Sequence, residues 1–151
     1  MKYLILFFLA LMPFLQSKAQ MNAKPVQCTF QLTKSPDGNY EIVAKLNIEE
    51  GWHLFTPDPG GDGFLIPTSM TLDKGQPIEQ AEKLLVKSKV VTKDIKEIGV
   101  VNYVEGNAMF ALPIIPSAQA KKVTGIFSYQ CCNDHMCLPP VDVNFTLEIK
   151  E

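Results

Sequence analysis

Apolar and polar residues alternate with a period of two along several short stretches of this chain. The alternation is most regular near the C-terminus, in the stretch VDVNFTLEI that begins at Val141, where every second residue is apolar. Successive side chains of a β-strand point to opposite faces, so this pattern predicts strands with one buried face. We predict strands over residues 26–32, 40–48, 69–72, 98–104, 108–114, 123–130 and 141–149.

Turn-forming residues separate these strands. Residues 35–39 read SPDGN, in which Gly38 can adopt the positive φ of a tight turn, so we expect the first two strands to form a hairpin. A second turn is predicted at Gly106. Residues 56–68 are rich in glycine and proline and predict a long loop, a feature typical of functional surfaces. Residues 77–93 fit helical and extended patterns about equally, and we interpret them as strand or irregular structure.

The number and spacing of these elements indicate the fold class. The chain has many short strands separated by turns, no convincing long amphipathic helix and no internal repeat. We therefore predict an all-β fold, an immunoglobulin-like antiparallel β-sandwich. The cysteine and tryptophan spacing that marks antibody domains is absent.

The N-terminus has the features of a secretory signal peptide over residues 1–19. Lys2 precedes an apolar run over residues 3–12, which is too short to cross a hydrocarbon core of roughly 30 Å as a helix. Small residues before Gln20 suit cleavage there. Residues 20–151 would then form a single exported domain of 132 residues (151 minus 19), with no further apolar segment that predicts a membrane span.

The charge of the chain argues against a nucleic-acid partner. All 14 basic residues are lysine, and two of them, Lys2 and Lys18, belong to the predicted signal peptide. The remaining 12 lysines face 16 acidic residues, a net charge of -4. Phosphate recognition favours arginine and an excess of positive charge, and this chain has neither.

Three of the four cysteines lie within residues 129–140, which read YQCCNDHMCLPP. The predicted strands on either side place Cys132 and Cys137 at facing ends of a hairpin. Paired strands bring Cα atoms into the range of about 4.4 to 6.8 Å that a disulfide requires. Closing so short a loop stabilises a fold by only ~2 kcal/mol, so this bridge would be a weak staple and a reasonable redox switch.

Two other interpretations of this segment remain open. Its three cysteines and His135 are soft ligands that could hold copper or zinc, although adjacent strand residues such as Cys131 and Cys132 point to opposite faces. The disulfide could also hold a loop in a non-catalytic immunoglobulin-like binding module, with residues 56–68 as its contact surface. We interpret His135 itself as a solvated turn residue.

The remaining cysteines and the second histidine carry less information. Cys28 and Cys131 each share a predicted strand face with apolar residues. They are either buried free thiols or the partners in a second disulfide, and the sequence does not distinguish these alternatives. We interpret His53 as a packing or hydrogen-bonding neighbour of Trp52 rather than a catalytic group.

One motif runs through the cysteine segment: Tyr-Gln, then Cys132, then four residues and Cys137, then Leu-Pro-Pro. Gly51-Trp52-His53 and the glycine- and proline-rich loop precede it. Together they resemble the N-terminal periplasmic domain of the thiol:disulfide interchange protein DsbD, over residues 26–149. The resemblance implies an immunoglobulin-like fold, a periplasmic location and thiol–disulfide exchange that requires no cofactor.

The resemblance also implies roles for individual residues. Cys132 and Cys137 would be the redox pair, with Cys137 forming the mixed disulfide and Cys132 resolving it. The site would be framed by Tyr129, Gln130, Pro139 and Trp52. A cap loop would fall within residues 93–103, where the aliphatic Ile95 and Ile98 stand in place of an aromatic residue. Cys131 is a further departure from the family pattern.

The partners that the resemblance implies are thioredoxin-like redox proteins. The electron donor would be a membrane-side reductase domain, and the acceptor a periplasmic disulfide isomerase or a thioredoxin of cytochrome c maturation. The sequence ends at Glu151 with neither a transmembrane nor a thioredoxin-like part. We therefore expect a separate protein to supply the electrons.

Overall fold

Antiparallel strands make up most of the described chain. A computed structural model describes residues 24–34 and 39–150, and no helix occurs within these ranges, so none is long and apolar enough to cross a membrane. The strands are β1 (Val26–Lys34), β2 (Tyr40–Ile48), β3 (His53–Gly60), β4 (Ser69–Leu72), β5 (Ile78–Gln80), β6 (Leu85–Val86), β7 (Val91–Ile95), β8 (Gly99–Glu105), β9 (Asn107–Pro116), β10 (Lys122–Tyr129), β11 (Cys131–Cys132) and β12 (Val141–Glu148).

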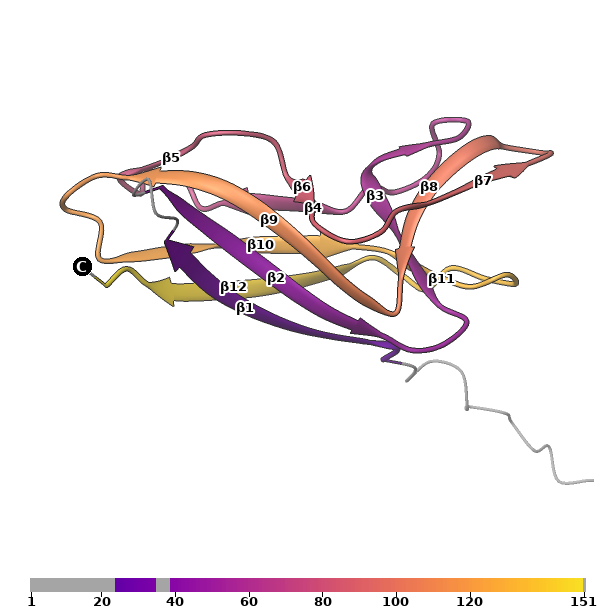
Figure 1. Ribbon diagram of the computed structural model, residues 1–151, viewed down its shortest axis with the longest axis horizontal. Coiled ribbons are helices and arrows are strands. Elements are labelled where there is room, and N and C mark those ends of the chain that lie inside the picture. The colour runs from indigo at the N-terminus through magenta and orange to yellow at the C-terminus, as the bar shows by residue number, and fades with distance from the viewer. Residues whose placement is uncertain (1–23, 35–38, 151) are drawn as a thin grey trace, which may run out of the picture.

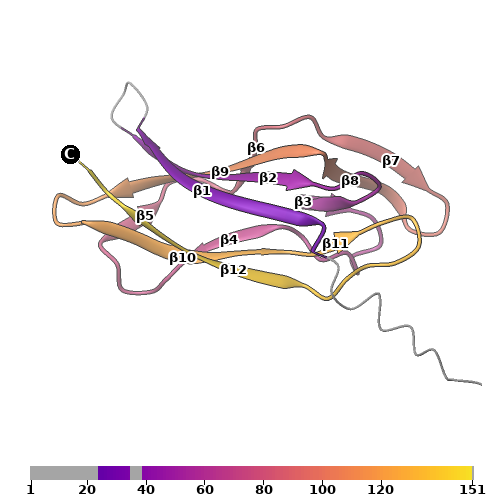
Figure 2. The same ribbon diagram turned by 90° about the horizontal axis from the view of Figure 1, so that it is seen from below.

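Two of the sheets face each other as the layers of a sandwich (Figures 1 and 2). One has the strand order β1-β2-β9-β5, with β6 also paired to β9. The other has the order β12-β10-β4. Figure 2 shows β1, β2 and β9 on one side of the molecule and β10 and β12 on the other. The predicted all-β antiparallel sandwich is confirmed.

The main core fills the space between these two layers. Phe110 of β9 and Phe127 of β10 are fully buried, and their ring centroids lie 5.7 Å apart. Phe30 of β1 meets Phe127 edge to face at 5.9 Å. Large aromatic side chains contribute most to such a core because each removes a large apolar area from water. The apolar residues of the alternating sequence pattern are therefore those on the inward faces of these strands.

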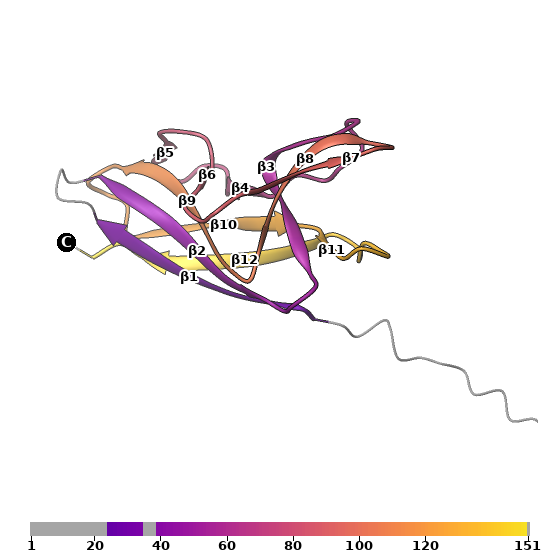
Figure 3. The same ribbon diagram turned by 45° about the vertical axis from the view of Figure 1, so that its right-hand side comes forward.

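The third sheet, ordered β11-β3-β8-β7, lies at one end of the sandwich (Figures 1 and 3). The chain passes from this sheet into the main sandwich between β8 and β9, at Gly106. This residue has a φ of 62°, a left-handed conformation that glycine adopts without strain. Its carbonyl accepts a hydrogen bond of 2.8 Å from the backbone of Ile48 in β2, which ties the end sheet to the sandwich.

The predicted strands agree closely with the structure. Each of the seven predicted ranges corresponds to one observed strand, displaced by two residues at most at either end, and the turn at Gly106 is confirmed. Residues 77–93, interpreted as strand or irregular structure, contain β5, β6 and the start of β7. The predicted signal peptide over residues 1–19 lies outside the described residues, as do residues 35–38 of the predicted hairpin turn. The hairpin pairing of β1 and β2 is confirmed.

The prediction of a continuous loop over residues 56–68 is wrong in its first part. Strand β3 continues to Gly60, and the loop begins only after it. The register of β3 against β8 shifts between Phe55 and Gly60. Pro57 and Pro59 lie in this irregular stretch, where a residue without an N–H group costs no ladder hydrogen bond. Proline there marks a bulged strand rather than the start of a loop.

We expect the Phe110→Ala substitution to lower the free energy of unfolding by about 3 to 5 kcal/mol, because it leaves a cavity at the centre of the core. Guanidinium denaturation measures this. Ile115→Ala on the same strand is the matched control, because Ile115 is 53% exposed, and its effect should stay below about 1 kcal/mol. Equal effects of the two substitutions would contradict this description of the core.

Candidate functional site

The cysteine segment folds back on itself and forms a disulfide. Cys132 and Cys137 are bonded, with an S–S distance of 2.00 Å and Cα atoms 4.0 Å apart, slightly closer than the range expected from the sequence. Cys132 belongs to the short strand β11, which pairs with the start of β3. A single bridge then pairs Cys132 with Cys137 across the loop. The disulfide thus joins the two ends of a tight loop that projects from the third sheet (Figure 3).

Asn133 shapes the tip of this loop. Its side-chain oxygen accepts hydrogen bonds of 2.9 Å from the backbone N–H groups of His135 and Met136. Its own N–H donates to the carbonyl of Met136 at 2.9 Å. Asparagine favours such turns because its short side chain imitates a backbone acceptor. The turn brings Cys137 back to Cys132.

Hydrogen bonds also close the base of the loop, outside the disulfide. The backbone N–H of Leu138 donates to the carbonyl of Cys131 at 2.8 Å. The side-chain amide of Gln130 donates to the carbonyl of Leu138 at 3.1 Å. Pro139 and Pro140 follow, and because proline has no backbone N–H, neither needs a hydrogen-bond acceptor there. The loop is therefore held at its base by groups other than sulfur.

The two bonded cysteines differ in exposure. Cys132 exposes 1% of its surface, whereas Cys137 is exposed at the rim of the loop. A thiolate that attacks a disulfide must reach one sulfur along the S–S axis. Cys137 is the exposed residue of the pair, so the arrangement distinguishes an accessible cysteine from a sheltered one.

Cys131 and Cys132 point to opposite faces of β11, as predicted for adjacent strand residues. Cys131 is buried in the main core, while Cys132 packs with Phe55 and Val101 in a second, smaller cluster. Among the described residues, no group of three or more histidine, cysteine, aspartate or glutamate side chains is placed to hold a metal ion.

Cys28 and Cys131 are free thiols. Burial raises the pKa of Cys28 to about 11. Burial, followed by the negative charge of Glu49, raises the pKa of Cys131 to about 12. Both thiols are therefore almost entirely protonated near neutral pH, where the thiolate is the reactive form. Cys131 is buried and Cys28 half-buried, so the structure favours two free thiols of low reactivity over a second disulfide.

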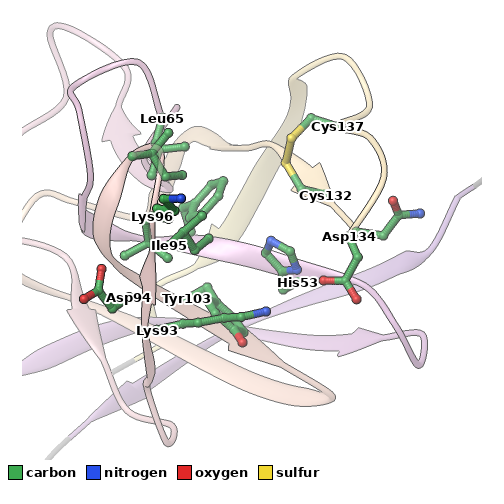
Figure 4. A pocket seen from close by; sticks show the side chains of 14 residues that line it. His53, Leu65, Lys93, Asp94, Ile95, Lys96, Tyr103, Cys132, Asp134 and Cys137 are labelled. Atoms are coloured by element: carbon green, nitrogen blue, oxygen red, sulfur yellow. A yellow bond between two sulfur atoms is a disulfide. The ribbon is translucent and has the colours of Figure 1, made fainter.

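A cavity of about 520 Å³ opens beside the disulfide (Figure 4). Cys132 and Cys137 form part of its wall. The β7–β8 hairpin forms another part, and Figure 4 shows Ile95 of this hairpin and Leu65 across the cavity from the disulfide. Both apolar and charged side chains line the cavity.

The predicted cap residues therefore lie beside the cysteine pair. Ile95 and Ile98 are half-buried and flank the turn of the β7–β8 hairpin, which a 3.0 Å hydrogen bond from the Ile98 N–H to the Ile95 carbonyl closes. The smaller apolar cluster consists of Phe55, Val101 and Cys132, with Leu65, Ile95, Ile98 and Tyr103 packed against it. Aliphatic contacts thus connect the hairpin to the sheltered cysteine.

The predicted framing residues occupy different places. Gln130 fixes the base of the loop, as described above. Tyr129 is buried and Trp52 half-buried, and both pack on the main core. Pro139 is exposed just beyond the loop. Of these four residues, none lines the cavity beside the disulfide.

His53 lines the cavity, and its sequence-based interpretation as a neighbour of Trp52 missed this. Its ring lies 4.6 Å from that of Tyr103 and 5.4 Å from that of Phe55, on the face opposite Trp52. Burial lowers the pKa of His53; the negative charges of Asp134 and Glu105 oppose this shift, and Lys93 adds to it. Trp52 precedes β3 and His53 begins it, and the place of His53 follows from its pairing with Cys132 of β11, which no local sequence pattern shows.

Two solved structures share this architecture. The N-terminal periplasmic domain of ScsB from Proteus mirabilis aligns with a TM-score of 0.62 and 15% identity, over 83% of this chain and 47% of that chain. The chain therefore spans about half the length of that ScsB chain. The reduced N-terminal domain of DsbD from Neisseria meningitidis aligns with a TM-score of 0.52 and 20% identity, over 82% of this chain and 85% of that chain. These likenesses confirm the predicted immunoglobulin-like fold.

Comparison of the sequence with known proteins and protein families identifies the family of the chain. No curated protein matches the chain. Residues 20–149 match the family described as thiol:disulfide interchange protein DsbD, N-terminal. This range includes the disulfide, the β7–β8 hairpin and both layers of the sandwich. The match confirms the resemblance found in the cysteine motif, and the chain belongs to the family of DsbD N-terminal domains.

Proposed function

We propose that this chain performs thiol–disulfide exchange in the periplasm and relays reducing equivalents between thioredoxin-like proteins. The observation that carries the proposal is the disulfide itself, which has one exposed and one sheltered sulfur and lies in a chain of a thiol:disulfide interchange family. A relay needs a pair that opens and closes without disturbing the fold. The short loop and its separate hydrogen bonds support such a pair.

The exchange proceeds through two substitutions at sulfur. In the reduced protein, the Cys137 thiolate attacks the disulfide of the acceptor, forms a mixed disulfide and releases one acceptor thiolate. Cys132 then attacks the Cys137 sulfur, restores the Cys132–Cys137 bond and releases the second acceptor thiolate. Two electrons pass to the acceptor. A reduced donor reverses these steps and regenerates the dithiol.

Exposure supports this order of events. Cys137 is the exposed sulfur and Cys132 the sheltered one. A protein partner therefore meets Cys137 first, and Cys132 acts from inside the site. Cys28 and Cys131 take no part, because their raised pKa values keep them protonated and both are at least half-buried.

The β7–β8 hairpin serves as the cap of the site. Its Ile95 and Ile98 pack toward Cys132 through aliphatic contacts. The hairpin thereby restricts the approach to one side of the disulfide, across the cavity that both of them line. Leu65, from the loop after β3, completes the apolar wall. Here aliphatic side chains take the place of an aromatic cap.

The partners that suit this site are thioredoxin-like proteins. A membrane-side reductase domain would supply the electrons, and a periplasmic disulfide isomerase or a cytochrome c maturation thioredoxin would receive them. Export by a cleaved signal peptide over residues 1–19 is consistent with this placement. The family match supports the choice of partner class.

Cysteine variants test the relay. We expect the reduced Cys132→Ser variant, incubated with the disulfide form of a thioredoxin, to accumulate a mixed disulfide through Cys137, because no sulfur remains to resolve it. Cys137→Ser should form no such species. Non-reducing electrophoresis and peptide mass mapping identify the adduct. Cycling of Cys137→Ser at the wild-type rate would refute these roles.

A redox titration is the companion control. In glutathione buffers, the Cys132–Cys137 pair should titrate reversibly within roughly -180 to -270 mV, the range of exchange proteins. A pair that stays oxidised below about -300 mV would instead be a structural bridge, as expected of a non-catalytic binding module.

Alkylation should separate the free thiols from the redox pair. At pH 8, pKa values of about 11 and about 12 leave roughly one thiolate per thousand at Cys28 and one per ten thousand at Cys131. In the reduced native protein, iodoacetamide should therefore modify Cys137 first, and Cys28 and Cys131 only after denaturation. Mass mapping at timed intervals measures this. Rapid labelling of Cys131 in the folded protein would contradict its burial.

Reducing an apolar side chain of the cap should make the Cys132–Cys137 disulfide more accessible. We expect Ile98→Ala to increase the rate at which oxidised protein reacts with a small thiol by severalfold, because the apolar wall beside Cys132 is thinned. Val100→Ala is the matched control, since Val100 is on the same hairpin and 52% exposed. If both variants react at the wild-type rate, the hairpin is not a cap.

A further inference from the structure

His53 lies directly across from Cys132. The antiparallel pairing of β3 and β11 makes these residues cross-strand partners, and both line the cavity beside the disulfide. Directly opposed residues of an antiparallel pair have Cβ atoms about 4.5 to 5.5 Å apart, on one face of the sheet. Figure 4 shows the imidazole adjacent to Cys132. The backbone of two paired strands therefore fixes the imidazole next to the sheltered sulfur.

The surroundings of His53 hold the ring and set its charge. Tyr103 and Phe55 contact the ring, at centroid distances of 4.6 Å and 5.4 Å. The charged groups that act on it are Asp134 from the cysteine loop, Glu105 from β8 and Lys93 from β7. Burial is the largest effect and lowers the pKa of the imidazole despite the two carboxylates. His53 is consequently a neutral proton acceptor at neutral pH.

Cys132 requires a proton acceptor inside the protein. Thiol–disulfide exchange uses the thiolate, so the Cys132 thiol must lose its proton when it resolves a mixed disulfide. Cys132 exposes only 1% of its surface, so its thiol has little direct contact with bulk water. Besides the cysteines, the titratable residues that line the cavity are His53, Tyr103, Asp134, Lys93, Asp94 and Lys96. Imidazole is the side chain that both accepts and releases a proton near neutral pH.

We propose that His53 is the acid–base group of the sheltered cysteine and exchanges a proton with Cys132 during each half of the redox cycle. This inference rests on the proposed function. In resolution, the Cys132 thiol transfers its proton to the neutral imidazole while its sulfur attacks Cys137. The bond between Cys137 and the partner breaks, and the partner leaves as a thiolate. The imidazolium then releases its proton to solvent.

The reverse half uses the same groups. A donor thiolate attacks the Cys137 sulfur, the Cys132–Cys137 bond breaks and Cys132 departs with the electron pair. The neutral imidazole of His53 takes a proton from solvent and passes it to the departing sulfur, which becomes the Cys132 thiol, and the ring returns to its neutral form. His53 therefore acts on the leaving and resolving sulfur, and leaves the first attack by Cys137 unaffected.

Reaction of the reduced protein with one equivalent of 5,5′-dithiobis(2-nitrobenzoate) separates these steps. The first thionitrobenzoate is released when Cys137 attacks the reagent, and the second when Cys132 resolves the mixed disulfide. We expect His53→Gln to slow the second release about tenfold or more, at the low end of what positioned acid–base groups contribute. The first release should change less than about twofold. His135→Gln is the matched control, because His135 is an exposed histidine in the loop between Cys132 and Cys137.

The pH profile gives a readout that a packing role would not move. In the wild-type protein the second release should be independent of pH above the pKa of His53 and fall below it. The midpoint should coincide with that of the His53 ring resonance in an NMR titration. In His53→Gln the rate should instead rise about tenfold per pH unit, because hydroxide must remove the proton. The wild-type profile tests the proposal even if the variant does not fold.

Each outcome decides a different point. An unchanged second release in folded His53→Gln, an equal slowing of both releases, or an equal effect of His135→Gln would overturn the role of His53. So would a wild-type midpoint that differs from the NMR titration. A wild-type protein that releases the first thionitrobenzoate but never the second would refute the proposed relay itself, because its cysteines would not form a reversible pair.

Discussion

The site depends on the pairing of a two-residue strand, β11, with the start of β3. This pairing fixes the direction of two adjacent cysteines, one toward the main core and the other toward the cavity. The partners of these cysteines in β3 point the same two ways: Leu54, opposite Cys131, faces the main core, and His53, opposite Cys132, faces the cavity. Without this register, the chain would have neighbouring thiols of similar environment. With it, Cys131 is a buried free thiol and Cys132 is bonded to Cys137.

The rest of the molecule supports this short pairing. The two-layered sandwich buries the aromatic side chains that stabilise the domain, and its β10 leads directly into β11. In the end sheet, β3 pairs directly with β11, and the β7–β8 hairpin lies beyond β3 in the strand order. Strand pairing therefore holds Cys132 in the end sheet, and the hairpin packs against the same small apolar cluster as Cys132. The sandwich thus provides most of the buried core, while the exposed Cys137 lies in the loop at the end sheet.

Sequence reasoning succeeded where the information was local. Alternation over Val141 to Glu148 specified a strand, and the family motif located Cys132 and Cys137. It missed features that depend on pairing between distant segments. The bulge that accommodates Pro57 depends on β8, and the place of His53 depends on β11. The difference in exposure between the bonded cysteines likewise follows from the tertiary contacts of β11, which no local pattern encodes.

The hydrogen bonds at the base of the cysteine loop have a thermodynamic consequence. Leu138 and Gln130 close that loop through backbone and amide groups, independently of sulfur. Breaking the disulfide therefore releases little conformational entropy, because the chain on either side stays in place. The oxidised and reduced forms can share one backbone, so the equilibrium between them reports the chemistry of the two sulfurs rather than the cost of refolding a loop.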